Sequence, residues 1–209
     1  MKILIVDDHA VIHHGLRRIL ADEFEGATFG EARHSQEALD LVCRESWDVV
    51  ILDMGLPGRG GLDVLKQIRA ERPKLPVIIF SMHPEEQFAI RALKAGASGY
   101  LAKESAPDQM VEAIRKVLSG GKYVSVALAE KLATDLARDS SLQPYEILSD
   151  REFEILRMIA AGKTTTAIAD QLSLSVKTVS TYRTRILEKL QLKTGSELIR
   201  YAVDHGLDH

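Results

Sequence analysis

The sequence predicts an α/β protein of two domains, in which a doubly wound five-stranded parallel sheet precedes a small all-α domain of four helices. Two observations support this prediction. Short apolar runs alternate with helical segments five times between residue 1 and about residue 121. Beyond residue 146 the apolar residues recur at helical spacing, which predicts helices without strands.

The apolar runs are too short for helices and too continuous for half-exposed strands, so each is predicted as a buried strand of a parallel sheet. They are KILIV at 2–6, ATFGEA at 27–32, DVVILD at 48–53, PVIIFS at 76–81 and SGYLA at 98–102. Helices are predicted between them and after the last, over 11–23, 35–46, 62–72, 84–95 and 107–119. Such βαβ units have right-handed crossovers, and the expected strand order is 2-1-3-4-5.

The sheet domain is predicted over 1–121, and residues 122–146 are predicted as a partly helical linker that ends in the polar run SSLQP. The all-α domain is predicted over 147–209. Its first helix follows Ser149, which stands in capping-box spacing with Glu152. A short helix, the turn SLS, a longer helix capped by Ser175 and a final helix in SELIRYAVDHGL follow. The middle two match helix-turn-helix geometry.

Composition narrows the function classes. Apolar residues make up 45% and charged residues 27% of the chain, as in ordinary soluble proteins, and no apolar run approaches the roughly 18 residues of a membrane span. KILIV is too short for a signal peptide and two aspartates follow it directly. Cys43 is the single cysteine, so no internal disulfide is expected and a reducing cytoplasm is the predicted location.

Four charged positions follow the apolar runs and define the candidate site. Asp7 and Asp8 follow KILIV, Asp53 follows VVIL, and Lys103 follows GYLA. The carboxyl ends of parallel strands share one sheet edge, so these groups are expected to converge there. Three carboxylates gathered together repel one another unless a cation joins them, and Mg²⁺ is the predicted ion. Asp53 is then placed to act as a nucleophile toward a phosphoryl group, with Lys103 balancing the charge of an aspartyl phosphate.

Other polar residues lie near this edge. Ser81 ends the fourth strand, and its hydroxyl can donate a hydrogen bond to a phosphoryl oxygen. Tyr100 lies in the fifth strand and can respond by moving between buried and exposed states. Three histidines, His9, His13 and His14, are interpreted as surface or boundary residues rather than metal ligands.

The formal net charge of −3 hides a local basic strip in the longer helix of the all-α domain. Lys177, Arg183, Arg185 and Lys189 stand there against Glu188. Such a strip suits a polyanion partner, although a solvated helix face has the same composition.

These motifs, in this order, resemble the receiver domain of bacterial two-component response regulators. IVDDH, ILDMGLPGRGGLDVL, FSMH and GYLAKES carry the likeness over residues 1–121. The segment LSDREFEILRMIAAGKTTTAIADQLSLSVKTVSTYRTRILEKL resembles the LuxR/FixJ-type (NarL-type) DNA-binding domain. The resemblance implies a flavodoxin-like receiver with a helix-turn-helix output domain.

The resemblance also implies roles for individual residues. Asp53 would be the phosphoacceptor, Asp7 and Asp8 the Mg²⁺-binding pair, the backbone carbonyl of Gly55 the third protein ligand, Ser81 and Tyr100 the switch pair, and Lys103 the phosphoryl-contacting lysine. The donor would be a phosphohistidine on a partner sensor histidine kinase. The product would be a signal, so the protein is not expected to be an enzyme, although the receiver would assist its own phosphorylation and dephosphorylation.

In the output domain, the longer helix would enter the major groove of promoter DNA. Base contacts are expected from Ser180, Thr181 and Thr184, and phosphate contacts from Lys177, Arg183 and Arg185, with Thr178 in the same contact set. A phosphorylated homodimer is the expected binding form, with the last helix, around Leu198 to Val203, as the implied dimer contact. Two alternatives stay open: a Mg²⁺-dependent aspartyl-phosphate enzyme, and a regulator that binds protein or acts without phosphorylation.

Overall fold

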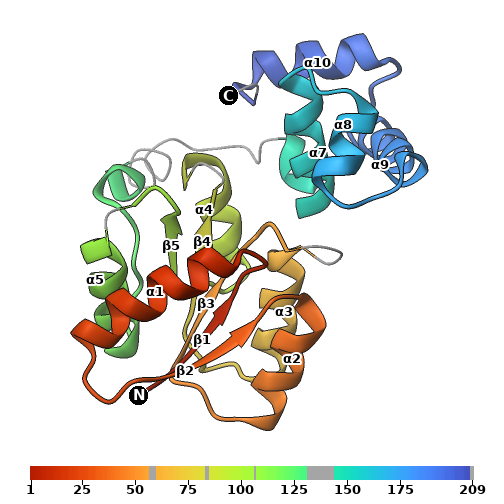
Figure 1. Cartoon of the computed structure of the whole chain (residues 1–209). Coiled ribbons are helices and arrows are strands. Elements are labelled where there is room, and N and C mark those ends of the chain that lie inside the picture. Colours follow the sequence, from red (N-terminus) through yellow and green to blue (C-terminus); the bar gives the residue numbers. More distant parts are fainter. Residues whose placement is uncertain (57–59, 83–84, 106, 131–143, 208–209) are drawn as a thin grey trace. The chain divides into compact units, whose positions relative to one another are not determined.

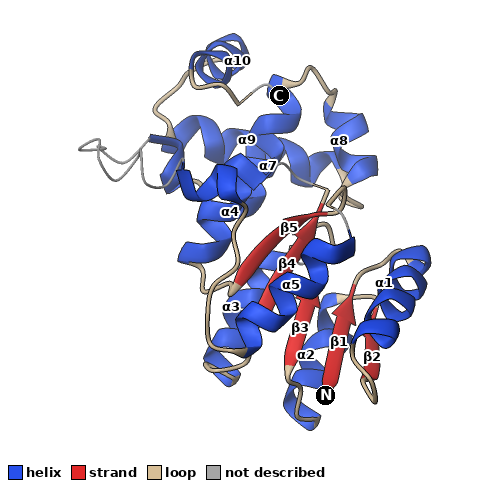
Figure 2. Ribbon diagram, turned by 90° about the vertical axis from the view of Figure 1, so that its left-hand side faces the viewer, coloured by secondary structure: helices blue, strands red, loops and turns tan. Residues whose placement is uncertain are grey.

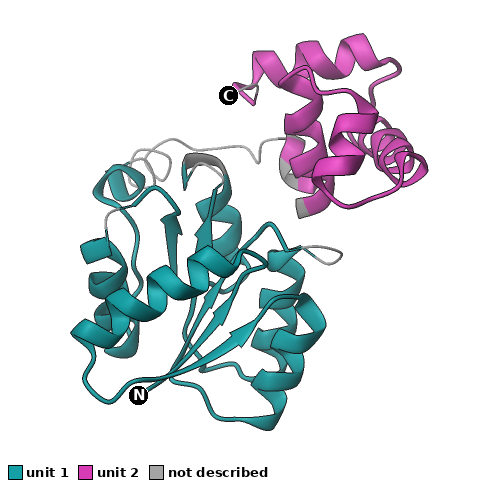
Figure 3. Ribbon diagram, viewed as in Figure 1, with its two compact units in different colours: residues 1–137 teal, residues 138–209 magenta. Residues whose placement is uncertain are grey.

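The computed structural model describes the chain except for residues 57–59, 83–84, 106, 131–143 and 208–209. The chain divides into two compact units, with the boundary between residues 137 and 138 (Figure 3). The division falls within the predicted linker. Part of that linker, residues 131–143, lies outside the described residues.

Unit 1 contains a five-stranded parallel sheet in the predicted order β2-β1-β3-β4-β5. Its strands are β1 (Lys2–Val6), β2 (Thr28–Ala32), β3 (Val49–Leu52), β4 (Val77–Ser81) and β5 (Gly99–Ala102). Its helices are α1 (Ala10–Glu23), α2 (Ser35–Arg44), α3 (Gly61–Glu71), α4 (Glu85–Lys94) and α5 (Pro107–Leu118). Helices α1 and α5 cover one face of the sheet, and α2, α3 and α4 cover the other (Figures 1 and 2). The prediction of a doubly wound fold is confirmed.

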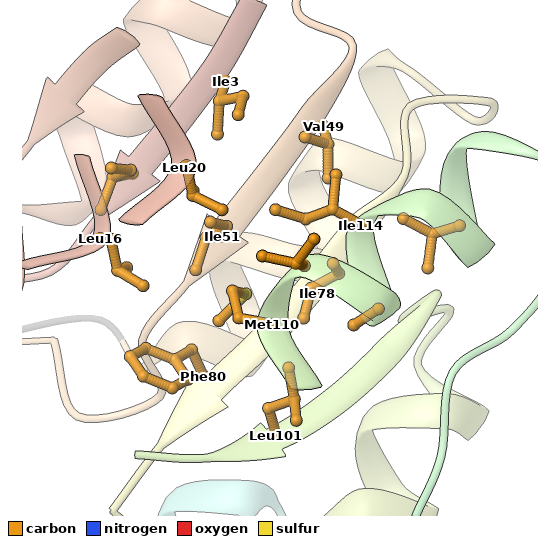
Figure 4. Close-up of a cluster of buried hydrophobic side chains, with 14 of the residues drawn as sticks. Ile3, Leu16, Leu20, Val49, Ile51, Ile78, Phe80, Leu101, Met110 and Ile114 are labelled. Carbon is orange, nitrogen blue, oxygen red and sulfur yellow. The ribbon is translucent and has the colours of Figure 1, made fainter. Parts of the chain in front are cut away.

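Apart from Lys2, every residue of β1, β3 and β4 is buried, as their continuous apolar runs predict, whereas the edge strand β2 is mostly half-buried. Between the sheet and helices α1 and α5 lies one large apolar cluster (Figure 4). It joins Ile3, Ile51 and Ile78 of three neighbouring strands to Leu20 of α1 and Ile114 of α5. This core holds the strands together. Because the strands are parallel, their carboxyl ends lie at the same edge of the sheet.

The chain after α5 returns to the sheet before it leaves unit 1. The N–H of Tyr123 donates to the carbonyl of Ser98 at 2.9 Å, and the carbonyl of Tyr123 accepts from the N–H of Tyr100 at 3.3 Å. The N–H of Ser125 donates to Oε1 of Glu85, the first residue of α4, at 3.1 Å. Residues 126–130 are helical. The start of the predicted linker is therefore tied to β5 and to α4.

Unit 2 contains a short 3₁₀ turn, η1 (Pro144–Ile147), and the four predicted helices α7 (Asp150–Ala160), α8 (Thr165–Gln171), α9 (Val176–Lys189) and α10 (Gly195–Asp204). Side chains that are almost fully buried form its core, including Phe153, Leu156, Ile168, Val179, Ile186 and Leu198. Ser173 has a φ of 52° in the turn between α8 and α9, a conformation that polar residues adopt in tight turns. The predicted helix-turn-helix arrangement is confirmed.

Local capping explains where α7 and α9 begin. Ser149 Oγ accepts the N–H of Glu152, and the Glu152 carboxylate accepts the N–H of Ser149, which completes the predicted capping box. Ser175 Oγ accepts the N–H of Thr178 at 3.0 Å, as predicted for the longer helix. Within the described residues no helix combines the length and apolar character needed to cross a membrane.

Glu152 also ties α7 to the end of α9, which gives a stability prediction. Burial acts to raise the pKa of Glu152, but the Lys189 ammonium, 2.6 Å from its Oε2, and hydrogen bonds from Ser149 hold that pKa below its usual value. Glu152→Gln is expected to cost about 2 kcal/mol at neutral pH, because a charge-assisted bond is lost. A depressed carboxyl pKa stabilises the fold above the unfolded pKa, and this stabilisation fades as pH falls through the folded pKa.

Hydrogen exchange of the α7 amides, followed by mass spectrometry, measures this loss. Glu188→Gln, which neutralises an exposed glutamate of α9, is the matched control and is expected to leave the protection of α7 unchanged. Equal protection in wild type and Glu152→Gln at neutral pH would show that the ion pair contributes nothing.

Candidate functional site

The carboxyl ends of β1, β3 and β5 bring two carboxylates and one ammonium group into contact. Lys103 Nζ lies 2.6 Å from Oδ2 of Asp7 and 3.0 Å from Oδ2 of Asp53. The side chains of Lys103, Asp7 and Asp53 are 4%, 2% and 5% exposed, so the three charged groups are almost completely shielded from solvent. Buried charges persist only when paired, and here one cation serves two anions.

Asp8 and His9 complete an acidic cluster that opens to solvent. Ligand atoms of Asp7, Asp8, His9 and Asp53 all lie within 4.8 Å of one another. His9 Nδ1 is 3.0 Å from Oδ1 of Asp7 and 2.8 Å from Oδ1 of Asp8, and the His9 N–H donates to Oδ1 of Asp7. The side chain of Asp8 is 36% exposed, which gives the cluster an open side.

The oxygen atoms at this edge fit a Mg²⁺ ion. Oδ2 of Asp7 is fully buried, and no donor among the described residues makes an aligned hydrogen bond to it, although the Lys103 ammonium pairs with it electrostatically. This oxygen therefore keeps a lone pair for a ligand. Clustered carboxylate oxygens are the ligands that a hard divalent cation prefers, so the residues present fit the ion.

Asp53 has a perturbed acidity. Burial raises the pKa of Asp53 above its ordinary value, the Asp7 carboxylate adds to the rise, and the Lys103 ammonium and a hydrogen bond from the Gly55 N–H act against it. The ionised carboxylate is thus poorly solvated and gains from any added cation. A perturbed carboxylate beside a specific charge partner is typical of a functional site.

Two glycines shape the loop that follows Asp53. The N–H of Gly55 points at the Asp53 carboxylate. The coordination of a cation by the Gly55 carbonyl stays a prediction. A Cβ at Gly61 would collide with the backbone carbonyl of Asp53, so this close approach requires glycine. The sequence alone does not reveal this role of Gly61, because its proximity to Asp53 depends on the path of the loop between β3 and α3.

The two predicted switch residues lie on neighbouring strands. Ser81 ends β4 and is 1% exposed, and its carbonyl accepts the N–H of Lys103 at 2.8 Å. Tyr100 of β5 pairs with Ile79 in the sheet register and is fully buried. Of the two predicted states of Tyr100, buried and exposed, the structure shows the buried one.

The histidines differ in environment, and the interpretation of all three as surface or boundary residues is wrong for one of them. His9 lies in the acidic cluster with an exposed ring, and His14 is exposed on α1. His13 is 1% exposed. It falls on the same helical face as Leu16 and Leu20, three and seven positions later, and this periodicity was the available signal.

In unit 2 the candidate nucleic-acid contacts lie on α9. All of them are exposed except the half-buried Thr178. The hydroxyls of Ser180, Thr181 and Thr184 donate to the carbonyls four residues earlier, at 2.9, 3.0 and 3.2 Å. The oxygen atoms of these three hydroxyls can still accept hydrogen bonds through their lone pairs.

The basic residues of α9 do not all share one face. Six residues at about 100° each place Arg183 roughly 120° around the helix from Lys177. The Arg183 guanidinium lies against Gly195, the first residue of α10, where a Cβ would collide with its Nη2. Arg185 lies over the Tyr182 ring, 5.9 Å from its centroid. Lys177, which precedes the exposed hydroxyls in the sequence, and Arg185, which follows them, lie on the hydroxyl side of α9, and the Arg183 guanidinium lies against the start of α10.

Two family models match the chain, and they match it in the same two parts. The response regulator receiver domain matches residues 3–115, and the bacterial regulatory proteins of the luxR family match residues 146–202. The chain therefore belongs to the bacterial response regulators that carry a LuxR-type DNA-binding output domain, and it is a DNA-binding transcription regulator.

Among curated relatives, the chain is 36% identical to the response regulator UvrY of Escherichia coli K12 over 99% of this chain and 95% of the relative. It is 39% identical to the response regulator GacA of Pseudomonas protegens over 99% of this chain and 97% of the relative.

Solved structures agree with this assignment. RcsB of Salmonella enterica serovar Typhimurium, bound to the rprA promoter with the phosphomimetic BeF3⁻, matches with a TM-score of 0.64 and 27% identity over 96% of this chain and 97% of that chain. A LuxR-family regulator from Aurantimonas sp. SI85-9A1 matches with a TM-score of 0.60 and 36% identity over 66% of this chain and 98% of that chain. Another neighbour shows two RcsB dimers bound to two parallel DNAs.

Proposed function

We propose that Asp53 accepts a phosphoryl group from a phosphohistidine of a sensor histidine kinase, and that the aspartyl phosphate promotes binding of a dimer to promoter DNA. The observation that carries this proposal is the Lys103 ammonium held between the buried carboxylates of Asp7 and Asp53. A structural ion pair needs one carboxylate for one ammonium. A second carboxylate, whose buried Oδ2 pairs with Lys103 but accepts no aligned hydrogen bond from the described residues, suits a site that binds further charge.

In the transfer step, an Asp53 oxygen attacks phosphorus, an O–P bond forms, and the P–N bond to the donor imidazole breaks. The electron pair of that bond leaves with the imidazole, which then takes a proton. Lys103 pairs with the added negative charge, and Ser81 is placed on the adjacent strand to donate its hydroxyl hydrogen to a phosphoryl oxygen.

Asp7, Asp8, Asp53 and the carbonyl of Gly55 are the proposed ligands of Mg²⁺. When bound, the ion supplies charge neutralisation for the phosphoryl oxygens. The backbone N–H of His9 donates to Oδ1 of Asp7, whereas the Asp8 carboxylate is partly exposed and accessible to an ion from solvent. The family comprises signalling proteins, and we assign to this chain only assistance in its own phosphorylation and dephosphorylation. Gly55 provides no side chain to orient a hydrolytic water.

The signal would pass through Ser81 and Tyr100. When the Ser81 hydroxyl turns to a phosphoryl oxygen, Tyr100 repacks on β5. The main chain of Tyr100 is bonded to Tyr123, and Glu85 of α4 is bonded to Ser125, so the start of the linker is attached to the elements that move. The proposed boundaries remain 1–121 for the receiver, 122–146 for the linker and 147–209 for the output domain, and the proposed location is the cytoplasm.

On DNA, α9 is the proposed recognition helix. Lys177 and Arg185 would contact phosphates, Ser180, Thr181 and Thr184 would contact base edges, and Thr178 and Arg183 would contact the backbone at the margins. Ile199 and Val203 of α10 are large apolar residues, 44% and 50% exposed at i, i+4 spacing, and they support the proposed dimer contact.

Phosphoryl incorporation tests the proposal. Wild-type protein mixed with a small phosphodonor and Mg²⁺ is expected to gain one phosphoryl group by intact-protein mass spectrometry, and Asp53→Asn is expected to gain none. Asp63→Asn, an exposed aspartate of α3, is the matched control and is expected to react normally. Incorporation into Asp53→Asn equal to that of wild type would remove Asp53 from the role of acceptor.

Asp53→Asn also tests whether the ionised Asp53 carboxylate destabilises the receiver. Without Mg²⁺ at neutral pH, Asp53→Asn is expected to raise the thermal midpoint of the receiver by a few degrees, because an ionised, desolvated carboxylate next to Asp7 is removed. Trp47 is the single tryptophan and lies in unit 1, so its fluorescence follows this domain. A lower midpoint in the variant would contradict the raised pKa of Asp53.

A further inference from the structure

His13 of α1 is buried and is not used in the proposed phosphoryl transfer, but its ring contacts the backbone of Asp7. Its Nε2 lies 2.6 Å from the backbone carbonyl oxygen of Asp7. Since a carbonyl only accepts, Nε2 carries the hydrogen and donates it. The other ring nitrogen, Nδ1, is buried without a hydrogen-bond partner among the described residues, with Oε2 of Glu31 at 3.9 Å.

The bond from His13 restrains the peptide that joins the two acidic residues. The N–H of Asp7 is held by the carbonyl of Ala32 at 3.0 Å, as the last rung of the β1–β2 pairing. The carbonyl of Asp7 lies beyond the strand and is held by the His13 ring. Because a peptide unit is planar, the direction of this carbonyl also fixes the direction in which Asp8 leaves. The backbone positions from which the Asp7 and Asp8 side chains extend are thereby restrained.

We propose that His13 is a positioning residue of the cation site, which holds the Asp7–Asp8 peptide so that both carboxylates meet one Mg²⁺ ion. This inference rests on the proposed function of the site. Mg²⁺ demands near-octahedral geometry at short distances, so a small rotation of this peptide costs affinity. Groups that orient metal ligands typically change metal affinity roughly 10- to 100-fold when they are removed.

Two substitutions separate positioning from packing. His13→Leu fills the site with an apolar side chain and removes the N–H donor. His13→Gln keeps an N–H donor at a similar reach. Calorimetric titration with Mg²⁺, and the Mg²⁺ dependence of phosphorylation by a small phosphodonor, are measured for both. His13→Leu is expected to raise the half-saturating Mg²⁺ concentration about ten-fold, with a near-normal rate at saturating Mg²⁺. His13→Gln is expected to restore most of the affinity.

Leu20→Ala is the matched control, because Leu20 is a fully buried residue of the same helix within the apolar core. It is expected to lower the thermal midpoint without changing the Mg²⁺ dependence. If His13→Leu fails to fold, His13→Asn, whose amide is too short to reach the carbonyl, takes its place in the comparison with His13→Gln.

The proposal is overturned if the donor-deficient variant lowers the thermal midpoint and leaves the half-saturating Mg²⁺ concentration at the wild-type value. It is also overturned if His13→Gln folds stably but binds Mg²⁺ as weakly as the donor-deficient variant. A wild-type protein that neither binds Mg²⁺ nor takes a phosphoryl group would instead refute the proposed function itself.

Discussion

Replacing Lys103 with methionine is expected to destabilise the receiver by about 3–5 kcal/mol at neutral pH, the largest stability effect that the site allows. The change removes the one ammonium that lies between Asp7 and Asp53, whose side chains are 2% and 5% exposed. Two adjacent buried carboxylates are then left without their cation. Urea unfolding followed by the fluorescence of Trp47 measures the loss in this domain.

The loss should depend on pH and on Mg²⁺. The pKa of Asp53 is already raised, and without Lys103 it rises further. A carboxyl group with a raised pKa binds its proton more tightly in the folded state, so stability falls as pH rises from the unfolded pKa to the folded one. The variant should therefore approach wild-type stability as pH falls toward the ordinary aspartate range. Mg²⁺ should also restore part of the loss at neutral pH, because it binds the folded state.

Lys74→Met is the control for removing a lysine charge, because Lys74 is exposed in the same domain. Its effect is expected to lie within about 0.5 kcal/mol of zero. If Lys103→Met proves no more destabilising than Lys74→Met, the ammonium does not compensate the buried carboxylates, and the assignment of its role is wrong.

Reversing the charge at Lys177 and Arg185 together is expected to weaken DNA binding by more than about 100-fold at moderate salt. Both residues are exposed and lie on the hydroxyl side of α9. Each contact with a phosphate releases counterions, so the slope of log affinity against log salt should fall by about two in the double variant. Fluorescence anisotropy, with duplexes selected from a random pool by the wild-type protein, measures both quantities.

Charge reversal at Arg18 and Lys66 of the receiver is the matched control, because it changes the net charge equally on exposed helix positions of unit 1. Binding by this control should stay near the wild-type value. Equal losses in both double variants would show that total charge, and not α9, governs the affinity.

The strand order and the meeting of charges at one sheet edge were predictable because parallel strands with continuous apolar runs leave few topologies. Asp7, Asp53 and Lys103 come together for this reason, since each follows its strand directly. The capping box at Ser149 was equally accessible, because it depends on residues three apart.

Features set by tertiary packing could not be predicted in the same way. The buried state of Tyr100 depends on how α4 and the segment at Tyr123 close over β5. The contact of Arg183 with Gly195 depends on where the turn after α9 places the start of α10. The burial of His13 was the exception that the sequence did allow to be predicted, because its spacing from Leu16 places it on the buried face of α1.

Gating of DNA binding by Asp53 is measured by comparing DNA affinity with and without a small phosphodonor plus Mg²⁺, at one defined salt concentration, in wild type and Asp53→Asn. Gating through an aspartyl phosphate predicts that affinity rises on addition of the phosphodonor in wild type alone. Equal binding by both proteins under both conditions would contradict it, and would leave a DNA-binding protein whose receiver does not gate the output through Asp53.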